Sequence, residues 1–124
     1  MTLSFLSGRF AVCRLTKDEA LPAWALGGPF VSVTRTLDEL SIVCPAECIP
    51  DGVRCEKGWR CLRVRGTLDF AEIGILSSIL EPLANARISV FVISTYDTDY
   101  VLIKQENETQ ARAVLAAAGH ALEN

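Results

Sequence analysis

The fold is decided by residues 88–104, which read ISVFVISTYDTDYVLIK. The β-branched run at 88–95 predicts a strand, residues 96–99 predict a turn, and residues 100–104 predict the returning strand. The first strand carries apolar residues on both faces, whereas a sheet face open to water normally alternates apolar with polar residues. We therefore expect helices on one face of this sheet, and the other half of the chain or another subunit on the second.

A similar hairpin is predicted earlier in the chain. Residues 30–36 are rich in Val and Thr, and the apolar residues 40–43 follow after a short polar interval. At an offset of 60 residues the two hairpins match in length and type, which aligns Val33, Glu39 and Ile42 with Ile93, Asp99 and Leu102. We infer an internal duplication.

Helical patterns surround the second hairpin. Asp69 is a candidate N-cap, and a single apolar face is expected from Ile73 through Leu76 and Leu80 to Leu83. Residues 107–110 predict the start of a last helix, which Gly119 closes before a possible final strand.

The first half has weaker helical signals. A capping-box pattern at residues 16–19 predicts a short helix that Pro22 and residues 27–29 interrupt. Only one helical turn fits around residues 46–49. Each half thus reads strand, helix, strand, strand, helix, with a possible final strand.

This order predicts an α+β protein with two ferredoxin-like (βαββαβ) subdomains, at residues 1–60 and 61–124, the first one degenerate. Their sheets are expected to be antiparallel, with helices packed on one face. Units of about 60 residues are marginal alone, so we expect the two halves to pack together and the chain to form a homodimer.

Composition excludes several functions. Half of the 124 residues are apolar, and the net charge of −3 gives no general attraction to nucleic acid or to an anionic membrane. A basic cluster is expected to be a solvated strand end, paired with acidic residues of the C-terminal third rather than with nucleic acid: Arg54, Lys57, Arg60, Arg63 and Arg65. No secretory signal or membrane-spanning apolar run is found, which predicts a cytoplasmic protein.

Catalytic and metal chemistry find little support. The five cysteines are odd in number and only Cys44 and Cys48 have a zinc-like spacing, so we expect reduced thiols, no metal site and no cofactor. His120 is the single histidine and is expected to be solvated in a mobile tail, where a nucleophilic triad is hard to build. We expect no catalytic residue and no enzyme activity.

The start of the helix near residues 69–76 is the best candidate for ligand binding. Free N–H groups and the positive end of the helix dipole suit a carboxylate, and Gly74 lets a ligand approach the backbone. Side chains that can offer polar contacts are Glu72, Ser94, Thr95 and Asp97. The alternative is an ordinary capped helix beside an ordinary hairpin.

Several segments of the second half, residues 69–76, 88–91, 93–95 and 97–103, resemble an ACT domain. The two halves together resemble the tandem arrangement in the regulatory part of aspartate kinases, and more closely the small ACT proteins related to cellular arginine sensors. The resemblance implies a regulatory fold, without catalysis, that binds small molecules, mostly amino acids, at subunit or domain interfaces. It assigns to the ligand loop Phe70, Ala71, Glu72, Ile73, Gly74 and Ile75.

The same resemblance implies that Ser94, Thr95 and Asp97 complete the pocket from a facing strand end, in the same or in a second protomer. Our leading hypothesis is a homodimeric sensor of an amino acid. The acidic residues Glu72 and Asp97 favour a basic or polar one. The alternative is a protein-interaction adaptor without a ligand, and a small enzyme ranks third. The sequence identifies neither the ligand nor the regulated partner.

Overall fold

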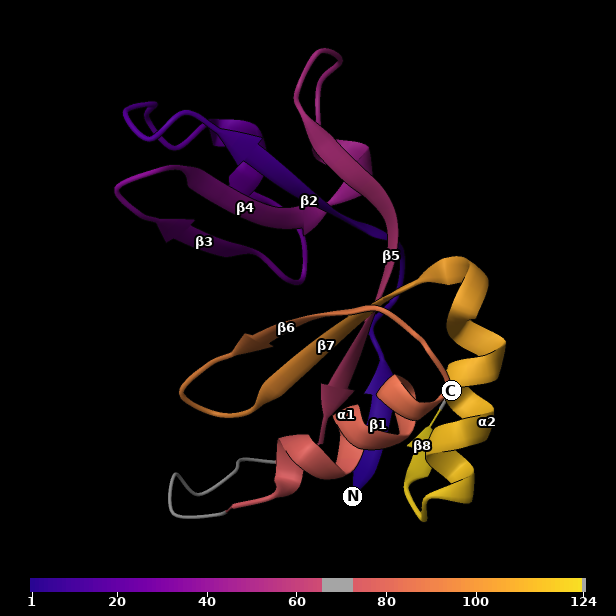
Figure 1. Ribbon diagram of the computed structural model, residues 1–124. Helices are drawn as coiled ribbons and strands as arrows, with labels where there is room; N and C mark the ends of the chain where they lie inside the picture. Colours follow the sequence, from indigo (N-terminus) through magenta and orange to yellow (C-terminus); the bar gives the residue numbers. More distant parts are fainter. Residues whose placement is uncertain (66–72, 124) are drawn as a thin grey trace. The chain divides into compact units, whose positions relative to one another are not determined.

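The computed structural model describes residues 1–65 and 73–123. The chain forms two compact units (Figure 1). We call Gly8–Trp59 the small unit, and Met1–Ser7 with Arg60–Asn124 the large unit. The first seven residues thus belong with the second half of the chain.

The small unit is a sheet with two short helical turns. Its strands follow the order β3-β4-β2-β5 and are antiparallel throughout. Alternate residues of β4 and β2, such as Leu40, Ile42 and Cys13, point into one core. The elements are β2 (Phe10–Leu15), η1 (Ala23–Leu26), β3 (Ser32–Arg35), β4 (Leu40–Pro45) and η2 (Ala46–Cys48). The strand β5 (Cys55–Val64) begins in this unit and continues into the large unit after Trp59.

The large unit contains both α-helices. Strand β5 pairs with β7 and β1, β6 lies on the outer side of β7, and β8 runs parallel to β1. The further elements are β1 (Thr2–Phe5), α1 (Ile75–Asn85), β6 (Val90–Ser94), β7 (Asp99–Lys104), η3 (Gln105–Asn107), α2 (Glu108–Ala117) and β8 (Ala121–Glu123).

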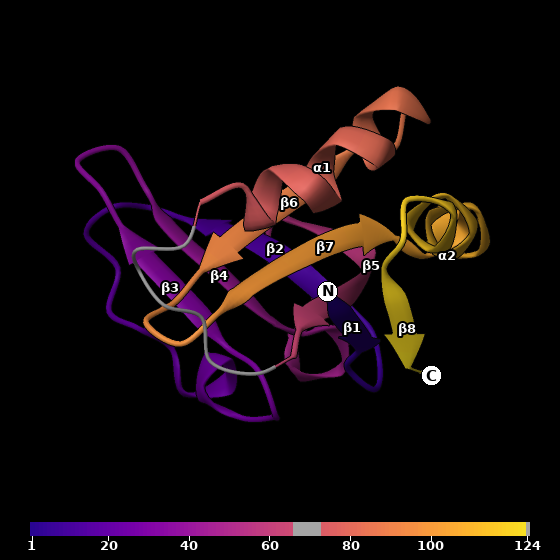
Figure 2. The same ribbon diagram turned by 90° about the horizontal axis from the view of Figure 1, so that it is seen from below.

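Both helices pack on the same core of the large unit. Ile79 and Leu83 of α1 and Leu115 of α2 are fully buried against alternate residues of the strands, among them Val101 and Ile103. The predicted α+β, ferredoxin-like class with helices on one sheet face is therefore confirmed for this unit (Figure 2). Among the described residues, no helix is long and apolar enough to cross a membrane.

One strand was not predicted. β1 lies beside β5, in the place where the last strand of a split βαβ unit would pair, and β8 pairs with β1 instead. The sheet is therefore mixed rather than antiparallel throughout. A four-residue strand at a chain end has too short an alternation to be recognised.

The two hairpins repeat, but at an offset of 59 residues rather than 60. Arg35 pairs with Leu40 and Ser94 pairs with Asp99, so each hairpin has a four-residue loop. In the first loop the N–H of Thr36 donates to the carbonyl of Glu39 at 2.9 Å, and in the second Thr95 donates to Thr98 at 2.9 Å. The elements η2 and η3 follow the two hairpins at the same offset.

The helix predicted from residues 16–19 does not form. The only helical turn before β3 is η1, which begins after Pro22. The guanidinium of Arg35 donates to the carbonyls of Lys17 and Glu19, the second at 2.8 Å. These carbonyls therefore bond a side chain instead of the N–H groups of a helix.

Helix α1 begins later than expected. Its first residue is Ile75 and its N-cap is Gly74, so Gly74 precedes the first turn rather than lying inside it. Ile73 is 92% exposed and does not belong to the apolar face, which consists of Ile79 and Leu83 with Leu76 and Leu80 partly buried. The predicted N-cap, Asp69, lies outside the described residues.

The end of α2 overturns the prediction for His120. Gly119 adopts φ +100, its N–H donates to the carbonyl of Ala116, and the N–H of His120 donates to Leu115, as in a Schellman motif. This closure turns the chain back into β8 and leaves His120 only 8% exposed. The histidine is a buried structural residue rather than part of a solvated tail.

Two isoleucines, one on each side of the start of α1, test the corrected helix register. We expect Ile79→Ala to lower the free energy of unfolding by about 2–5 kcal/mol, because it opens a cavity in the core. Ile73→Ala should change it by less than about 0.5 kcal/mol, because the side chain is exposed. Urea unfolding followed by circular dichroism measures both. Equal losses in the two variants would contradict this helix register.

Candidate functional site

The candidate site lies at the start of α1 and at the turn between β6 and β7. Both views of the large unit show α1 running opposite to β6, so the first turn of α1 and the end of β6 lie at the same end of the unit (Figures 1 and 2). The described residues bring Ile73, Gly74 and Ile75 together at the helix start. Ser94, Thr95 and Asp97 lie together at the turn.

Gly74 leaves open space in front of the helix. It adopts φ +80, and no atom lies within 4 Å of the position that a Cβ would occupy. Glycine has no side chain to accept from the N–H groups of the first turn. The Ser78 N–H donates to the Gly74 carbonyl at 3.0 Å. The backbone therefore combines accessibility with donors that a carboxylate can accept from.

His120 contacts the N-terminal part of α1 at the backbone of Ser78. Its Nε2 lies 2.9 Å from the carbonyl oxygen of Ser78, and the Ser78 hydroxyl donates to the carbonyl of Ile75 at 2.6 Å. Sequence analysis missed this role because the contact spans 42 residues and follows from the closure of α2. His120 is a positioning residue for the helix start.

The polar residues of the β6–β7 turn have different roles. The Thr95 hydroxyl donates to the Thr98 carbonyl at 3.1 Å and accepts from its N–H at 3.4 Å, so the turn itself uses this group. The Ser94 hydroxyl donates to Asp99 at 2.6 Å and keeps its acceptor lone pairs. Asp97 is exposed at the tip. Ser94 therefore keeps acceptor capacity, and Asp97 is accessible to solvent.

Three predicted site residues, Phe70, Ala71 and Glu72, lie outside the described residues. Their assignment to a ligand loop remains a prediction. In the part of the chain that the structure describes, no group of three or more His, Cys, Asp or Glu side chains gathers as a metal site.

Comparison with known proteins identifies the family. The sequence profile of the ACT domain matches residues 54–117. The chain belongs to the ACT domain family. A second profile, of a family of N-terminal domains, matches residues 8–52, which lie within the small unit.

Solved structures show how widely this ACT fold is shared. A protein from Agobacterium tumefaciens is 45% identical, with a TM-score of 0.94 over 98% of this chain and 91% of that chain. The ligand-free regulatory subunit of aspartate kinase from Thermus thermophilus is 9% identical, with a TM-score of 0.63 over 90% of this chain and 93% of that chain. At that identity the second likeness concerns the fold alone.

Curated relatives share a shorter stretch of the ACT protein. The human protein named cytosolic arginine sensor for mTORC1 subunit 1 is 43% identical over 49 residues, which are 39% of this chain. The bovine protein of the same name matches equally. The match spans 15% of the length of these relatives.

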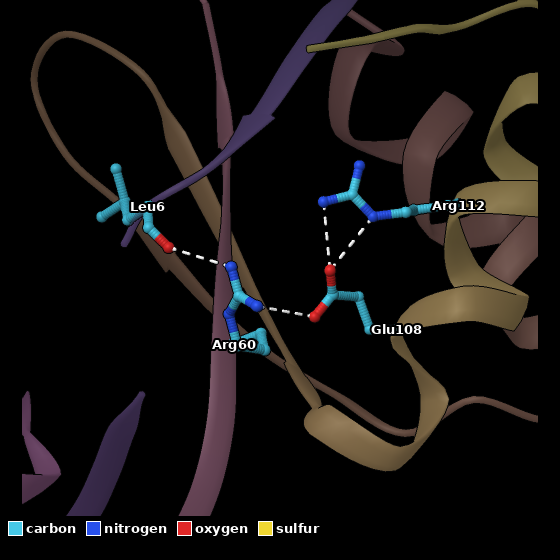
Figure 3. A network of polar contacts seen from close by, with 4 residues as sticks. All are labelled: Leu6, Arg60, Glu108 and Arg112. Atoms are coloured by element: carbon cyan, nitrogen blue, oxygen red, sulfur yellow. Dashed lines mark hydrogen bonds and ion pairs between the residues drawn. The ribbon is translucent and has the colours of Figure 1, made fainter. Parts of the chain in front are cut away.

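Glu108 joins Arg60 and Arg112 in a polar network around Phe5, of which only the pairing of Arg60 with an acidic residue of the C-terminal third was predicted. Glu108 accepts from Arg60 through one carboxylate oxygen at 2.7 Å, and from Arg112 through the other at 3.0 and 3.1 Å (Figure 3). Arg60 also donates to the Leu6 carbonyl at 3.2 Å. Both guanidinium groups lie over the ring of Phe5, at 5.2 and 4.5 Å from its centroid. The i,i+4 spacing of Glu108 and Arg112 was the available sequence signal.

Two members of the basic cluster have acidic partners. Arg60 pairs with Glu108, and Arg65 pairs with Glu123. The predicted pairing of basic residues with acidic residues of the C-terminal third is confirmed at these two positions.

The cysteines are all free thiols. Burial, followed by the neighbouring Cys44 and Cys55, raises the pKa of Cys13 from 9.0 to about 12. Burial alone raises the pKa of Cys61 from 9.0 to about 12, and burial is also the main cause that raises the pKa of Cys44. Because the thiolate is the nucleophilic form, these three groups are poor nucleophiles at neutral pH.

The network around Phe5 should contribute to stability. We expect Glu108→Gln to lower the free energy of unfolding by about 1–3 kcal/mol, because two partly buried guanidinium groups lose a charged acceptor. Glu123→Gln is the matched control, since its pair with Arg65 is 49% exposed on both sides and should contribute less than about 1 kcal/mol. Urea unfolding measures both, and a larger loss in the control would contradict the assigned role.

The buried thiols should make stability depend on pH in alkaline solution. A thiol whose pKa is raised in the folded state contributes stability below its unfolded pKa of 9.0, and this contribution is lost as the pH rises toward about 12. We expect the free energy of unfolding to fall above pH 9, with a smaller slope in Cys61→Ala. The same slope in Cys61→Ala as in the unchanged protein would contradict this origin. Unfolding in urea at a series of pH values measures the slope of the free energy of unfolding against pH.

Proposed function

We propose that this ACT protein is a non-catalytic regulatory module that binds an amino acid at the start of α1. The observation that carries the proposal is Gly74, which leaves open space directly before the first turn of a helix in an ACT fold. Ile73, Gly74 and Ile75 would offer backbone to the ligand. Ser94 and Asp97 would offer side chains from the β6–β7 turn.

The chemistry of the site matches an α-amino acid. The ligand carboxylate would accept from N–H groups of the first turn, where the helix dipole favours negative charge. Asp97 would face the ammonium group or a basic side chain, and the predicted loop residues Phe70, Ala71 and Glu72 would add further contacts. Thr95 would act through the turn that it closes.

The names of the relatives guide the choice of ligand. Curated relatives are called arginine sensors, and structures of the same fold include regulatory subunits of aspartate kinase. Arginine is the first amino acid to test, because the acidic residues Asp97 and Glu72 favour a basic ligand.

The proposal includes a homodimer with the ligand near the subunit interface. Within the large unit β6 is an edge strand, since it pairs only with β7 among the described strands. Its residues from Val90 to Ile93 are all apolar and half-buried. An apolar edge of this kind favours pairing with another chain. A cytoplasmic location, with neither a nucleic acid nor a membrane as partner, remains part of this proposal.

Ligand binding should raise the melting temperature. A ligand at a hundredfold excess over its Kd stabilises the bound form by about 2.7 kcal/mol, which corresponds to a shift on the order of 10 °C. A thermal-shift panel of the twenty amino acids, with arginine first, measures this effect. A flat panel at millimolar concentration would sink the proposal.

Two variants and two matched controls locate the site. Gly74→Val should abolish the ligand-induced shift because its side chain fills the open space, whereas Gly8→Val, also at positive φ in open space, should retain it. Asp97→Asn should reduce the shift for arginine. Asp38→Asn, at the equivalent position of the first hairpin loop, should not.

The second candidate function is a protein-interaction adaptor, which the same apolar edge of β6 favours. Size-exclusion chromatography distinguishes the two functions. Assembly that changes with an amino acid supports the sensor, while constant assembly together with a flat thermal panel supports the adaptor.

A further inference from the structure

The small unit contains a hollow of about 490 Å³, and all of its lining residues belong to that unit. It lies between the end of β2, the segment that leads to η1, and the residues that precede β5. Its charged lining residues are Arg14, Arg54 and Glu19, and Trp24 is its aromatic residue. Ligand pockets commonly occupy about 300–1,000 Å³, so a small molecule fits.

Two arginines are cross-strand neighbours in the lining of this hollow. The N–H of Arg14 donates to the carbonyl of Arg54 at 2.9 Å, which continues the pairing of Cys13 with Cys55 by one residue. Residues directly opposite on antiparallel strands place their side chains on the same face, where two like charges destabilise the sheet. An anion between the two guanidinium groups removes this repulsion.

The two guanidinium groups keep donors for such an anion. Arg14 donates to the carbonyl of Asp38 at 3.0 Å, which anchors the group and leaves most of its five N–H donors. Among the described residues, none forms an ion pair or a hydrogen bond with the Arg54 side chain. Paired guanidinium forks match the oxygens of a carboxylate.

A third arginine fixes the segment of the lining that contains Glu19. Arg35 of β3 donates to the carbonyls of Lys17 and Glu19 and so holds the backbone that carries Glu19. With Arg14, Arg54 and Glu19 the lining carries one net positive charge, which a single carboxylate neutralises. A second anionic group would lie beside Glu19 and be repelled.

Trp24 gives the hollow an apolar side. Its indole is half-buried, packs on the core of the small unit and also lines the hollow, as do Leu15, Pro22 and Val53. Aromatic and aliphatic walls with a few charged groups are typical of sites for organic ligands rather than for free ions.

We propose that this hollow is a second binding site, which takes a small organic acid with one carboxylate between Arg14 and Arg54 and an apolar group against Trp24. The site is independent of the proposed amino-acid site in the large unit.

The test uses the full chain labelled with ¹⁵N at its two tryptophans. The probe 3-phenylpropanoate should move the indole N–H signal of Trp24 saturably and leave that of Trp59 in place, with Trp24→Phe assigning the signals. Arg54→Gln should weaken binding by at least about tenfold, the effect of losing a charge-assisted pair. Lys17→Gln, which removes the same charge from the same unit without touching the hollow, should weaken binding less than about twofold.

Three results would overturn the proposal. They are an unmoved Trp24 signal at millimolar probe, an equal loss of binding in Arg54→Gln and Lys17→Gln, and equally tight binding of inorganic phosphate, which would indicate a plain anion site. Because Arg54→Gln also relieves the repulsion, it should keep or raise the melting temperature of the free protein. A clear decrease would contradict the repulsion between Arg14 and Arg54 and count against the proposal as well. The readout at Trp24 is separate from the amino-acid panel, so either proposal can fail alone.

Discussion

Each hairpin depends on a threonine hydroxyl that closes a four-residue turn. Thr36 and Thr95 accept from the N–H of the residue three positions later and fix the first pair of each ladder. The register of the whole hairpin follows from that pair, because a slip of one residue would move every side chain to the opposite face. The burial of Leu40 in one core and Ile103 in the other therefore depends on these turns.

Local periodicity was sufficient to predict both hairpins, the last helix and the duplication. It could not fix the offset, because the β-branched runs align almost equally well at 59 and 60 residues. At 60, Glu39 aligns with Asp99 on charge alone, whereas the turn hydrogen bonds align Glu39 with Thr98. Register is a property of backbone pairing, and a pattern of side chains reports it only when one face is clearly polar.

Three of the wrong predictions concern contacts between distant parts of the chain. The helix expected at residues 16–19 competes with Arg35, and the burial of His120 depends on Ser78 in the other helix. Residues 2–5 form strand β1 because they pair with β5 on one side and with β8 on the other. For the candidate site, the sequence located Gly74 and the turn residues but placed Gly74 inside the helix rather than before it.

The two halves differ in the segment that follows their first repeated strand, which is β2 in the small unit and β5 in the large unit. In the large unit a full helix starts there and presents backbone N–H groups, whose partial charges favour a carboxylate at Gly74. In the small unit Pro22 and the bonds of Arg35 prevent the helix, so no such donors form. A hollow lies in this part of the small unit instead of a helix. The positive charge in its lining comes from the side chains of Arg14 and Arg54. Full guanidinium charges can hold an anion without a helix dipole, so the two proposed sites would use different donors.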